Sequence, residues 1–328
     1  MTAPARSHPE IQPSLLVEGM GPVGFRSSAE AWTGAIVKNY LMRVVRPLLG
    51  FTRAALLRVL PFIKVFPTRL TDHSAVEGLL DRLHPVLTDK ELIRLGPRGD
   101  GGYLVPDDLA GIEMLFSPGV DRISGFEKDC AELGMRVFMA DKSVEQPADV
   151  HDLFHFTRKH LGAISDEETM TLDDWVSESS PGSSADLLLQ IDIEGGEYEV
   201  LLATSAELLR RFRIIVAEFH QLDMLFSAPF FGLANTTFEK ILQTHDCVHI
   251  HPNNCCGSLR VGELEVPRIA EFTFHRRDRL EQCGFATEFP HPLDVDNTSA
   301  SHMKLSPSLF RHPGRELGDS SRGRRHRA

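Results

Sequence analysis

The chain has 328 residues, 42% hydrophobic and 25% charged, which is typical of a globular protein with one large or two small domains. Its formal net charge is −11, yet residues 31–71 carry seven Lys/Arg and no acid, and residues 311–328 carry six Arg. An acidic body with basic ends argues against a nucleic-acid groove across the main domain. No apolar stretch approaches the ~18 residues that a membrane-spanning helix needs.

Five cysteines are present, and no two have the C-x-x-C spacing of a zinc or redox motif. A bridge between the neighbours Cys255 and Cys256 would close only a strained ring, so we expect a reducing compartment and no structural zinc. The first residues, MTAPARSHPEIQPS, lack the charged-then-apolar order of a secretory signal. We therefore expect a cytoplasmic protein.

The N-terminal part divides into two segments. Residues 1–30 are rich in Pro, Gly and Ser, and we expect them to be disordered. Residues 31–71 interleave apolar residues with isolated cations, which predicts a basic amphipathic helical extension broken by prolines. Such an extension can dock on the main domain or on a partner subunit, it can lie on an anionic membrane through residues 31–66, or it can be a cleavable targeting segment. The sequence leaves the oligomeric state open.

From residue 72 the pattern becomes regular, and we expect one domain over residues 72–310, followed by a disordered Arg-rich tail at 311–328. Ser74, with Glu77 three residues later, predicts the capped start of a helix. Short apolar runs predict strands at 113–116, 136–140, 153–157, 187–193, 214–219, 247–251 and 269–275, although 153–157 is nearly as compatible with a helix. Helices are predicted at 74–83, 126–133, 171–176, 196–209 and 236–245. This alternation predicts an α/β fold with a seven-stranded, Rossmann-like, doubly wound and mostly parallel sheet.

The run LLLQIDIEGGEYEVLL, at 187–202, is the most informative segment. Its apolar part reads as a buried central strand that leads directly into Asp192, Glu194 and Glu197, with Gly195 and Gly196 between them. Open α/β sheets bind ligands at the carboxyl ends of their strands. Acids there are unfavourable without a cation, a donor or a ligand hydroxyl, so this segment indicates a site.

A second feature resembles a nucleotide-binding turn. The first predicted strand runs into Ser117, Pro118, Gly119 and Asp121, and the next strand ends at Asp141, twenty-two residues after Gly119. An acid at that position accepts hydrogen bonds from both ribose hydroxyls of an adenosine ligand. The G-x-G-x-x-G pattern is absent, so an ordinary β–α turn followed by a solvated Asp is the alternative.

Acids, imidazoles and amides also follow the later strands. These residues are Glu218, His220, His249, His251, Asn253 and Asn254. A histidine there can take a proton from a hydroxyl nucleophile, and carboxylates with imidazole can instead hold a divalent metal, which is possible but not predicted. We expect His249 to face away from His251.

Several motifs together resemble FkbM-type methyltransferases, in a branch called methyltransferase-like. The motifs are GDGGYLVPDD, FSPGV, SGFEKDCAELG, FMAD, TLDDWV, LLLQIDIEGGEYEVL, IIVAEFH, HIHPNN and VPRIAEFTFHRRD, which together cover about residues 90–277. The resemblance implies an enzyme that transfers a methyl group from S-adenosylmethionine, most often to a hydroxyl of a small molecule or a glycan.

The resemblance also implies roles for individual residues. Ser117, Pro118, Gly119 and Asp121 would lie under the cofactor, Asp141 would hold its ribose, and Asp192 would lie beside the methionine and the reacting methyl group. The acceptor would face Glu194, Glu218, His220, His251, Asn253 and Asn254, with His220 or His251 as the base, polarised by Asp192 or Glu218. The chain departs from the family pattern in the single glycine of SPGV and in Gln190, where a lysine is common. Two alternatives are therefore kept, a catalytically silent binding module and a nicotinamide-dependent oxidoreductase.

Overall fold

The computed structural model describes residue 60 and residues 67–120 and 123–311. Contacts divide the chain into Met1–Pro67 and Thr68–Ala328, and all helices and strands named here belong to the second unit. The segment expected to be disordered at the N-terminus, nearly all of the basic extension, and the Arg-rich tail beyond residue 311 lie outside the described residues.

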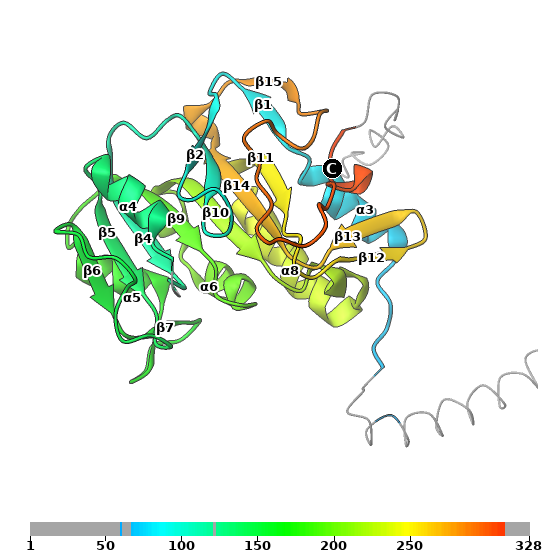
Figure 1. Ribbon diagram of the computed structural model, residues 1–328. Helices are drawn as coiled ribbons and strands as arrows, with labels where there is room; N and C mark the ends of the chain where they lie inside the picture. The colour runs from blue at the N-terminus through cyan, green and yellow to red at the C-terminus, as the bar shows by residue number, and fades with distance from the viewer. Residues whose placement is uncertain (1–59, 61–66, 121–122, 312–328) are drawn as a thin grey trace, which may run out of the picture. The chain divides into compact units, whose positions relative to one another are not determined.

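A seven-stranded sheet forms the centre of the described domain, in the order β11-β14-β10-β9-β4-β5-β6 (Figure 1). Its strands are β4 (Ile112–Pro118), β5 (Arg136–Ala140), β6 (Phe154–Thr157), β9 (Asp186–Ile191), β10 (Phe212–Phe219), β11 (His245–Pro252) and β14 (Ala270–Arg276). Only β14 runs antiparallel to its neighbours, β10 and β11, while the pairs from β10 to β6 are parallel. The predicted Rossmann-like, mostly parallel α/β sheet is therefore confirmed.

Helices and a hairpin cover the two faces of this sheet. On one face, apolar residues of α3, α5, α6 and α8 pack on alternate strand residues such as Leu187, Leu189 and Ile215. On the other face, α4 and the β2–β3 hairpin pack on the intervening residues such as Leu188 and Val216. This alternation, with both faces buried, explains why the central strands are almost continuously apolar.

The helices follow the predicted order with three differences. They are α3 (His73–Arg82), α4 (Gly125–Glu132), α5 (Leu172–Ser179), α6 (Glu197–Ala203), α7 (Ala206–Leu209) and α8 (Ala228–Ile241), with short 3-10 turns at Leu222–Phe226, Arg277–Arg279 and Pro307–Leu309. The helix expected at 196–209 is broken because Ser205 accepts the N–H of Leu208 and starts a new helix. The cap of α3 is Asp72, not Ser74, and α8 begins eight residues before its predicted start, with a proline in its first turn.

Four small two-stranded sheets were not predicted. They are β1 (Val86–Thr88) with β15 (Gln282–Phe285), β2 (Leu92–Leu95) with β3 (Tyr103–Pro106), β7 (His160–Leu161) with β8 (Thr169–Met170), and β12 (Ser258–Val261) with β13 (Leu264–Pro267). The β2–β3 hairpin matters for function because its glycine-rich connection, residues 96–102, reaches the ends of the central strands.

Two further observations concern the cysteines and the membrane. Cys255 and Cys256 are joined as a vicinal disulfide on the surface, so the expectation that these neighbours stay unbridged is wrong. Within the described residues, no helix has the length and apolar character needed to cross a bilayer.

Candidate functional site at the strand ends

Gly119 and Asp192 meet where β4 and β9 end. The N–H of Asp192 donates to the carbonyl oxygen of Pro118 at 3.3 Å, and the N–H of Gly119 donates to that of Ala140, the last residue of β5, at 3.0 Å. Gly119 has φ +89°, and a Cβ built on it would lie 1.6 Å from the carbonyl oxygen of Asp192. Only glycine fits this position, so the ends of three neighbouring strands close on one another here.

A cavity of about 70 Å³ opens beside this contact. It is lined by Asp100, Gly101, Tyr103, Gly119, Ile123, Glu127, Gln190 and Asp192. A cavity of about 760 Å³ lies elsewhere, between β1, β11 and residues 286–292, and contains none of the predicted site residues except His249. We locate the site at the smaller cavity, because the strand ends and the buried acids are there. Asp121 lies outside the described residues.

Ser117 lies beneath this cavity. Its hydroxyl is 2.5 Å from Glu127 Oε1 and 2.6 Å from Gln190 Oε1, and Gln190 Nε2 donates to the Tyr103 hydroxyl at 3.2 Å. Burial raises the pKa of Glu127 to about 7. A protonated Glu127 can donate to Ser117, which in turn donates to Gln190. Ser117 therefore links α4 to β9 and does not line the cavity itself.

Asp141 directly follows β5 at the same edge of the sheet. Its carboxylate accepts the N–H of Ser143 at 2.7 Å, and its own N–H donates to Thr157 at the end of β6. Asp141 does not line the cavity that Gly119 and Asp192 share. The structure thus places it one strand away from Gly119, next to Ala140.

A row of acids crosses the sheet beyond Asp192. Ile191 pairs with Ala217, so Asp192 and Glu218 follow at the same level of neighbouring strands. Glu218 is opposite Glu271, and Glu271 is opposite His251. Burial, together with the charge of the next acid in the row, raises the pKa of Asp192 and of Glu218 to about 8. Burial also raises the pKa of Glu271 to about 7. Three buried acids this close together cannot all be ionised unless a bound cation offsets their charge, so without a cation some of them hold protons.

The two asparagines after β11 have different partners. Asn253 Nδ2 donates to Glu218 Oε1 at 2.9 Å. Asn254 is turned to the C-terminal segment, where its amide bonds Thr298 and the carbonyl oxygen of Ala300. Asn253 thus belongs to the acid row, whereas Asn254 holds the segment at residues 298–300 in place through hydrogen bonds.

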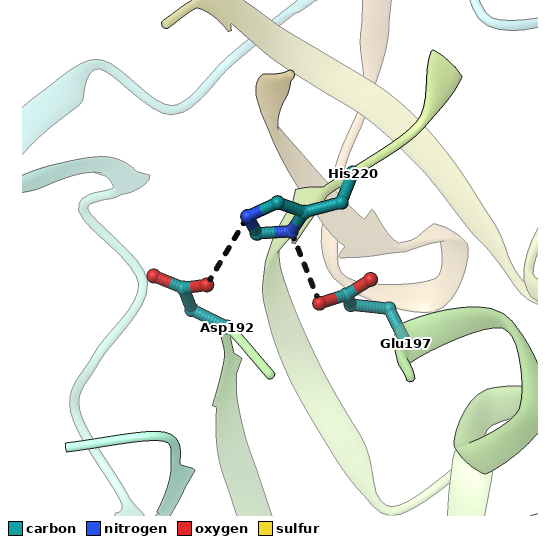
Figure 2. A group of neighbouring side chains, drawn as sticks. All are labelled: Asp192, Glu197 and His220. Carbon is teal, nitrogen blue, oxygen red and sulfur yellow. Dashed lines mark hydrogen bonds and ion pairs between the residues drawn. The ribbon is translucent and has the colours of Figure 1, made fainter. Parts of the chain in front are cut away.

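His220 lies between carboxylates from two directions, as Figure 2 shows for Glu197 and Asp192. Its Nδ1 is 3.2 Å from Glu197 Oε1, and its Nε2 is 3.9 Å from Asp192 Oδ1 and 3.4 Å from Glu194 Oε2. Burial disfavours the charged ring, but the hydrogen bond with Glu197 and the surrounding acids outweigh it and raise the pKa of His220 to about 9. His220 therefore holds a proton at neutral pH in the ligand-free protein.

His251 has a different environment. Its Nδ1 is 3.6 Å from Asp294 Oδ1, and His249 Nε2 is 2.9 Å from the same oxygen. The expectation that His249 faces away from His251 is wrong, because residues two apart in a strand share a face. Both rings are buried at the far end of the acid row. Of the two proposed bases, only His220 contacts Asp192.

Asp192, Glu197 and His220 bring three ligand atoms within 4.8 Å of one another. Glu197 Oε1, however, already accepts the N–H groups of Ile193 at 2.9 Å and Gly195 at 3.1 Å in addition to facing the imidazole. An ion bound to this oxygen would compete with these donors. The geometry favours holding a proton over holding a metal.

Sequence reasoning missed some residues of the site. Asp100, Tyr103 and Glu127 line the cavity, and Glu271 extends the acid row. Glu197 was among the acids that the sequence places after the central strand, but its contact with His220 was not predicted. Asp100, Tyr103 and Glu127 lie in the GDGGY and SGFEKD motifs, whose spacing alone does not show which strand end they reach. Glu271 lies within β14, between β11 and β10, and its position inside a strand gave no signal for a site.

Comparison with known proteins identifies a matching family. Residues 132–285, somewhat less than half of the chain, match the model of the methyltransferase FkbM domain, which confirms the resemblance over that segment. The match contains Asp141, Asp192 and His220 but begins after Gly119. No curated protein matches the chain.

Among solved structures, the chain is similar to one from Anabaena variabilis described as "Putative methyltransferase from antibiotic biosynthesis pathway". The identity is 11% and the TM-score 0.23, and the likeness covers 56% of this chain and 66%, just under two thirds, of the other.

Proposed function

We propose that this protein, whose residues 132–285 match the methyltransferase FkbM domain, transfers a methyl group from S-adenosylmethionine to a hydroxyl of a small molecule or a glycan. The observation that carries the proposal is the contact of Gly119 with Asp192 at the strand ends, beside a cavity with buried acids. Open α/β sheets bind their ligands at this edge.

The chemistry of the lining residues fits this cofactor. S-adenosylmethionine carries a sulfonium and an ammonium group, and both cations would be stabilised by the ionised form of Asp192 at the cavity and of Glu218 beside it. The described cavity, at about 70 Å³, accommodates only part of such a ligand. The lining residues therefore match the cofactor in charge, and the cavity does not match it in size. Gly119, Asp192 and Glu127 would hold the amino-acid end, and Asp141 the ribose. When bound, the cofactor supplies an already activated methyl group.

The chain's own part in the reaction is alignment and proton removal. His220 is the better base of the two candidates, because its Nε2 lies beside Asp192, whereas His251 is held by Asp294. Glu218 lies on β10, next to β9, and Asn253, which follows β11, bonds it; both would bind further hydroxyls of the acceptor. Glu194, with 89% of its side chain exposed, borders His220 from the solvent side.

A ligand screen by thermal shift tests the proposal against its alternatives. S-adenosylmethionine and S-adenosylhomocysteine should raise the melting temperature, since a ligand at 100 times its dissociation constant adds about 2.7 kcal/mol of stability. Stabilisation by NADH alone would favour an oxidoreductase. Cofactor binding without methyl transfer across a panel of sugars and small alcohols would favour a silent binding module.

A further inference from the structure

The side chain of Glu197 folds back over the turn that joins β9 to α6. It is the first residue of α6 and is 0% exposed. Its Oε1 accepts the N–H groups of Ile193 and Gly195 and faces Nδ1 of His220 at 3.2 Å (Figure 2). Gly195, with φ +106°, allows this tight turn. One buried oxygen thus joins the turn after β9 to the residue after β10.

The next residue of the same helix holds the backbone of His220. The hydroxyl of Tyr198, a fully buried side chain, donates to the carbonyl oxygen of His220 at 2.9 Å. Glu197 and Tyr198 therefore fix the ring and the main chain of one residue together. His220 itself is 8% exposed, so its ring has little freedom to turn.

The chemistry of a carboxylate decides which ring nitrogen carries the hydrogen. An oxygen that already accepts two backbone N–H groups can only accept from an imidazole, so Nδ1 is the donor. When His220 is neutral, its lone pair is then on Nε2, which faces Asp192 and Glu194. Glu197 is fully buried and does not line the cavity, so any effect it has on an acceptor acts through His220.

We infer that Glu197 is the positioning residue of this site, which holds His220 in the Nδ1–H tautomer and directs Nε2 to the hydroxyl that becomes methylated. This inference rests on the proposed function for the role of Nε2 but not for the tautomer. As the acceptor O–H bond breaks, Nε2 takes the proton and the oxygen keeps the electron pair for its new bond to the methyl carbon. The bond between that carbon and sulfur breaks with its electron pair left on sulfur, and the proton leaves Nε2 for solvent.

The charged groups around His220 come from every element packed against it. They are Glu197 from α6, Asp192 and Glu194 from the end of β9, and Glu218 from β10. All four favour the protonated ring, but only Glu197 forms a hydrogen bond with it. Removing this one charge should therefore lower the pH at which Nε2 becomes available.

Nitrogen-15 NMR of the histidine rings in the full chain tests the tautomer without any cofactor. The signal of His220, assigned by its loss in His220→Gln, should show a protonated Nδ1 and an unprotonated Nε2 at alkaline pH. The opposite tautomer in the wild-type protein would overturn the inference. This experiment needs no variant of Glu197 to fold.

Methyl transfer in Glu197→Gln tests the consequence. The amide keeps an oxygen for the two backbone donors but removes the charge, so kcat should fall roughly 100-fold, the lower end of what a positioned base contributes. The ascending limb of its pH profile should move to lower pH, which a purely structural lesion would not cause. Glu197→Asp should restore part of the rate, and Glu199→Gln, at an exposed position of the same helix, should behave as wild type.

The experiments distinguish a failure of the positioning role of Glu197 from a failure of the proposed methyl transfer. An unchanged rate and pH profile in Glu197→Gln would overturn the positioning role. The expected tautomer in a protein that neither binds S-adenosylmethionine nor transfers a methyl group would instead overturn the proposed function, and the Glu197–His220 pair would stand as a structural feature.

Discussion

Gly119 lies so close to Asp192 that a Cβ on Gly119 would be 1.6 Å from the Asp192 carbonyl oxygen. This contact joins the ends of β4 and β9, and the cavity of the site is lined by both residues. The backbone of Gly119 at the end of β4 thus determines where Asp192 at the end of β9 can lie. The proposed cofactor site depends on this approach.

Gly119→Ala should therefore weaken cofactor binding strongly. The methyl group has no space and Gly119 also has φ +89°, so the turn must move away from Asp192. We expect at least tenfold weaker binding of S-adenosylmethionine by calorimetry. Gly134→Ala is the matched control, because Gly134 has the same φ of +89° but a Cβ added to it would meet no atom within 4 Å. Equal affinity in the two variants would contradict this role of Gly119.

The affinity for S-adenosylmethionine should rise with pH. Burial and the charge of Glu218 raise the pKa of Asp192 to about 8, so below that pH the carboxyl is largely neutral and attracts a cation less. From pH 6 to pH 8, affinity should increase by up to about tenfold per pH unit for each proton released. S-adenosylhomocysteine, whose sulfur is uncharged, should show a weaker dependence. Calorimetry on wild type and Asp192→Asn measures this, and an identical pH slope for both ligands would contradict it.

His220→Ala should lower methyl transfer far more than His251→Ala does. His220 Nε2 lies beside Asp192, while His251 is held by Asp294 at the far end of the acid row. We expect roughly a 100-fold loss of kcat in His220→Ala with cofactor affinity retained. A double variant His220→Ala, His251→Ala with wild-type turnover would reject a histidine base altogether.

The buried ion pairs of Asp108 should matter for stability and not for catalysis. Asp108 accepts hydrogen bonds from Arg279 at 2.8 Å and from His275 at 3.1 Å, and it also contacts the buried Arg213. Asp108→Ala leaves these donors without their acid, which should lower the free energy of unfolding by about 3 kcal/mol. Thermal unfolding measures this loss, with the exposed neighbour Asp107→Ala as control.

The same cluster gives the chain an acid-sensitive component. Burial opposes the charge of Asp108, but hydrogen bonds from Arg279 and His275 outweigh it and hold the pKa of Asp108 below its ordinary value of 3.8. A depressed folded-state pKa stabilises the fold above the unfolded pKa, and this contribution is lost as pH falls through the folded pKa. Urea unfolding between pH 5 and pH 2 should therefore show a smaller loss of stability in Asp108→Ala than in wild type.

The basic segment at residues 31–66 remains a proposed membrane contact, outside the described residues. If it lies on anionic lipid, the full chain should sediment with vesicles that contain phosphatidylserine, and salt should weaken this binding. Deletion of residues 1–67 should abolish it. Equal sedimentation of the full and the shortened chain would contradict the contact.

The sequence predicts the sheet well because its central strands are buried on both faces and read as continuous apolar runs. The wrong predictions lie where one local sequence pattern is compatible with two structures. Ser205 is compatible with a continuing helix until its side chain is seen to cap α7, and Pro229 marks the first turn of α8 but reads as a loop residue. The hairpins at the edges are too short to give a period.

The candidate site could be predicted only in part, for a physical reason. Residues that directly follow a strand, such as Asp192 and His220, are placed by the sheet itself, so the sequence locates them. Glu127 and Asp100 reach the same cavity from a helix and a hairpin loop, whose packing no local pattern encodes. Asn254 follows a strand yet bonds the C-terminal segment, which only long-range contacts reveal.

A crystal structure of the full chain with S-adenosylhomocysteine tests the central claim most directly. We predict the ligand at the ends of β4, β5 and β9, with its amino-acid end between Gly119 and Asp192 and its ribose at Asp141. Binding at the larger cavity beside β1 and β11, or no density at the strand ends in crystals soaked at saturating concentration, would contradict the account.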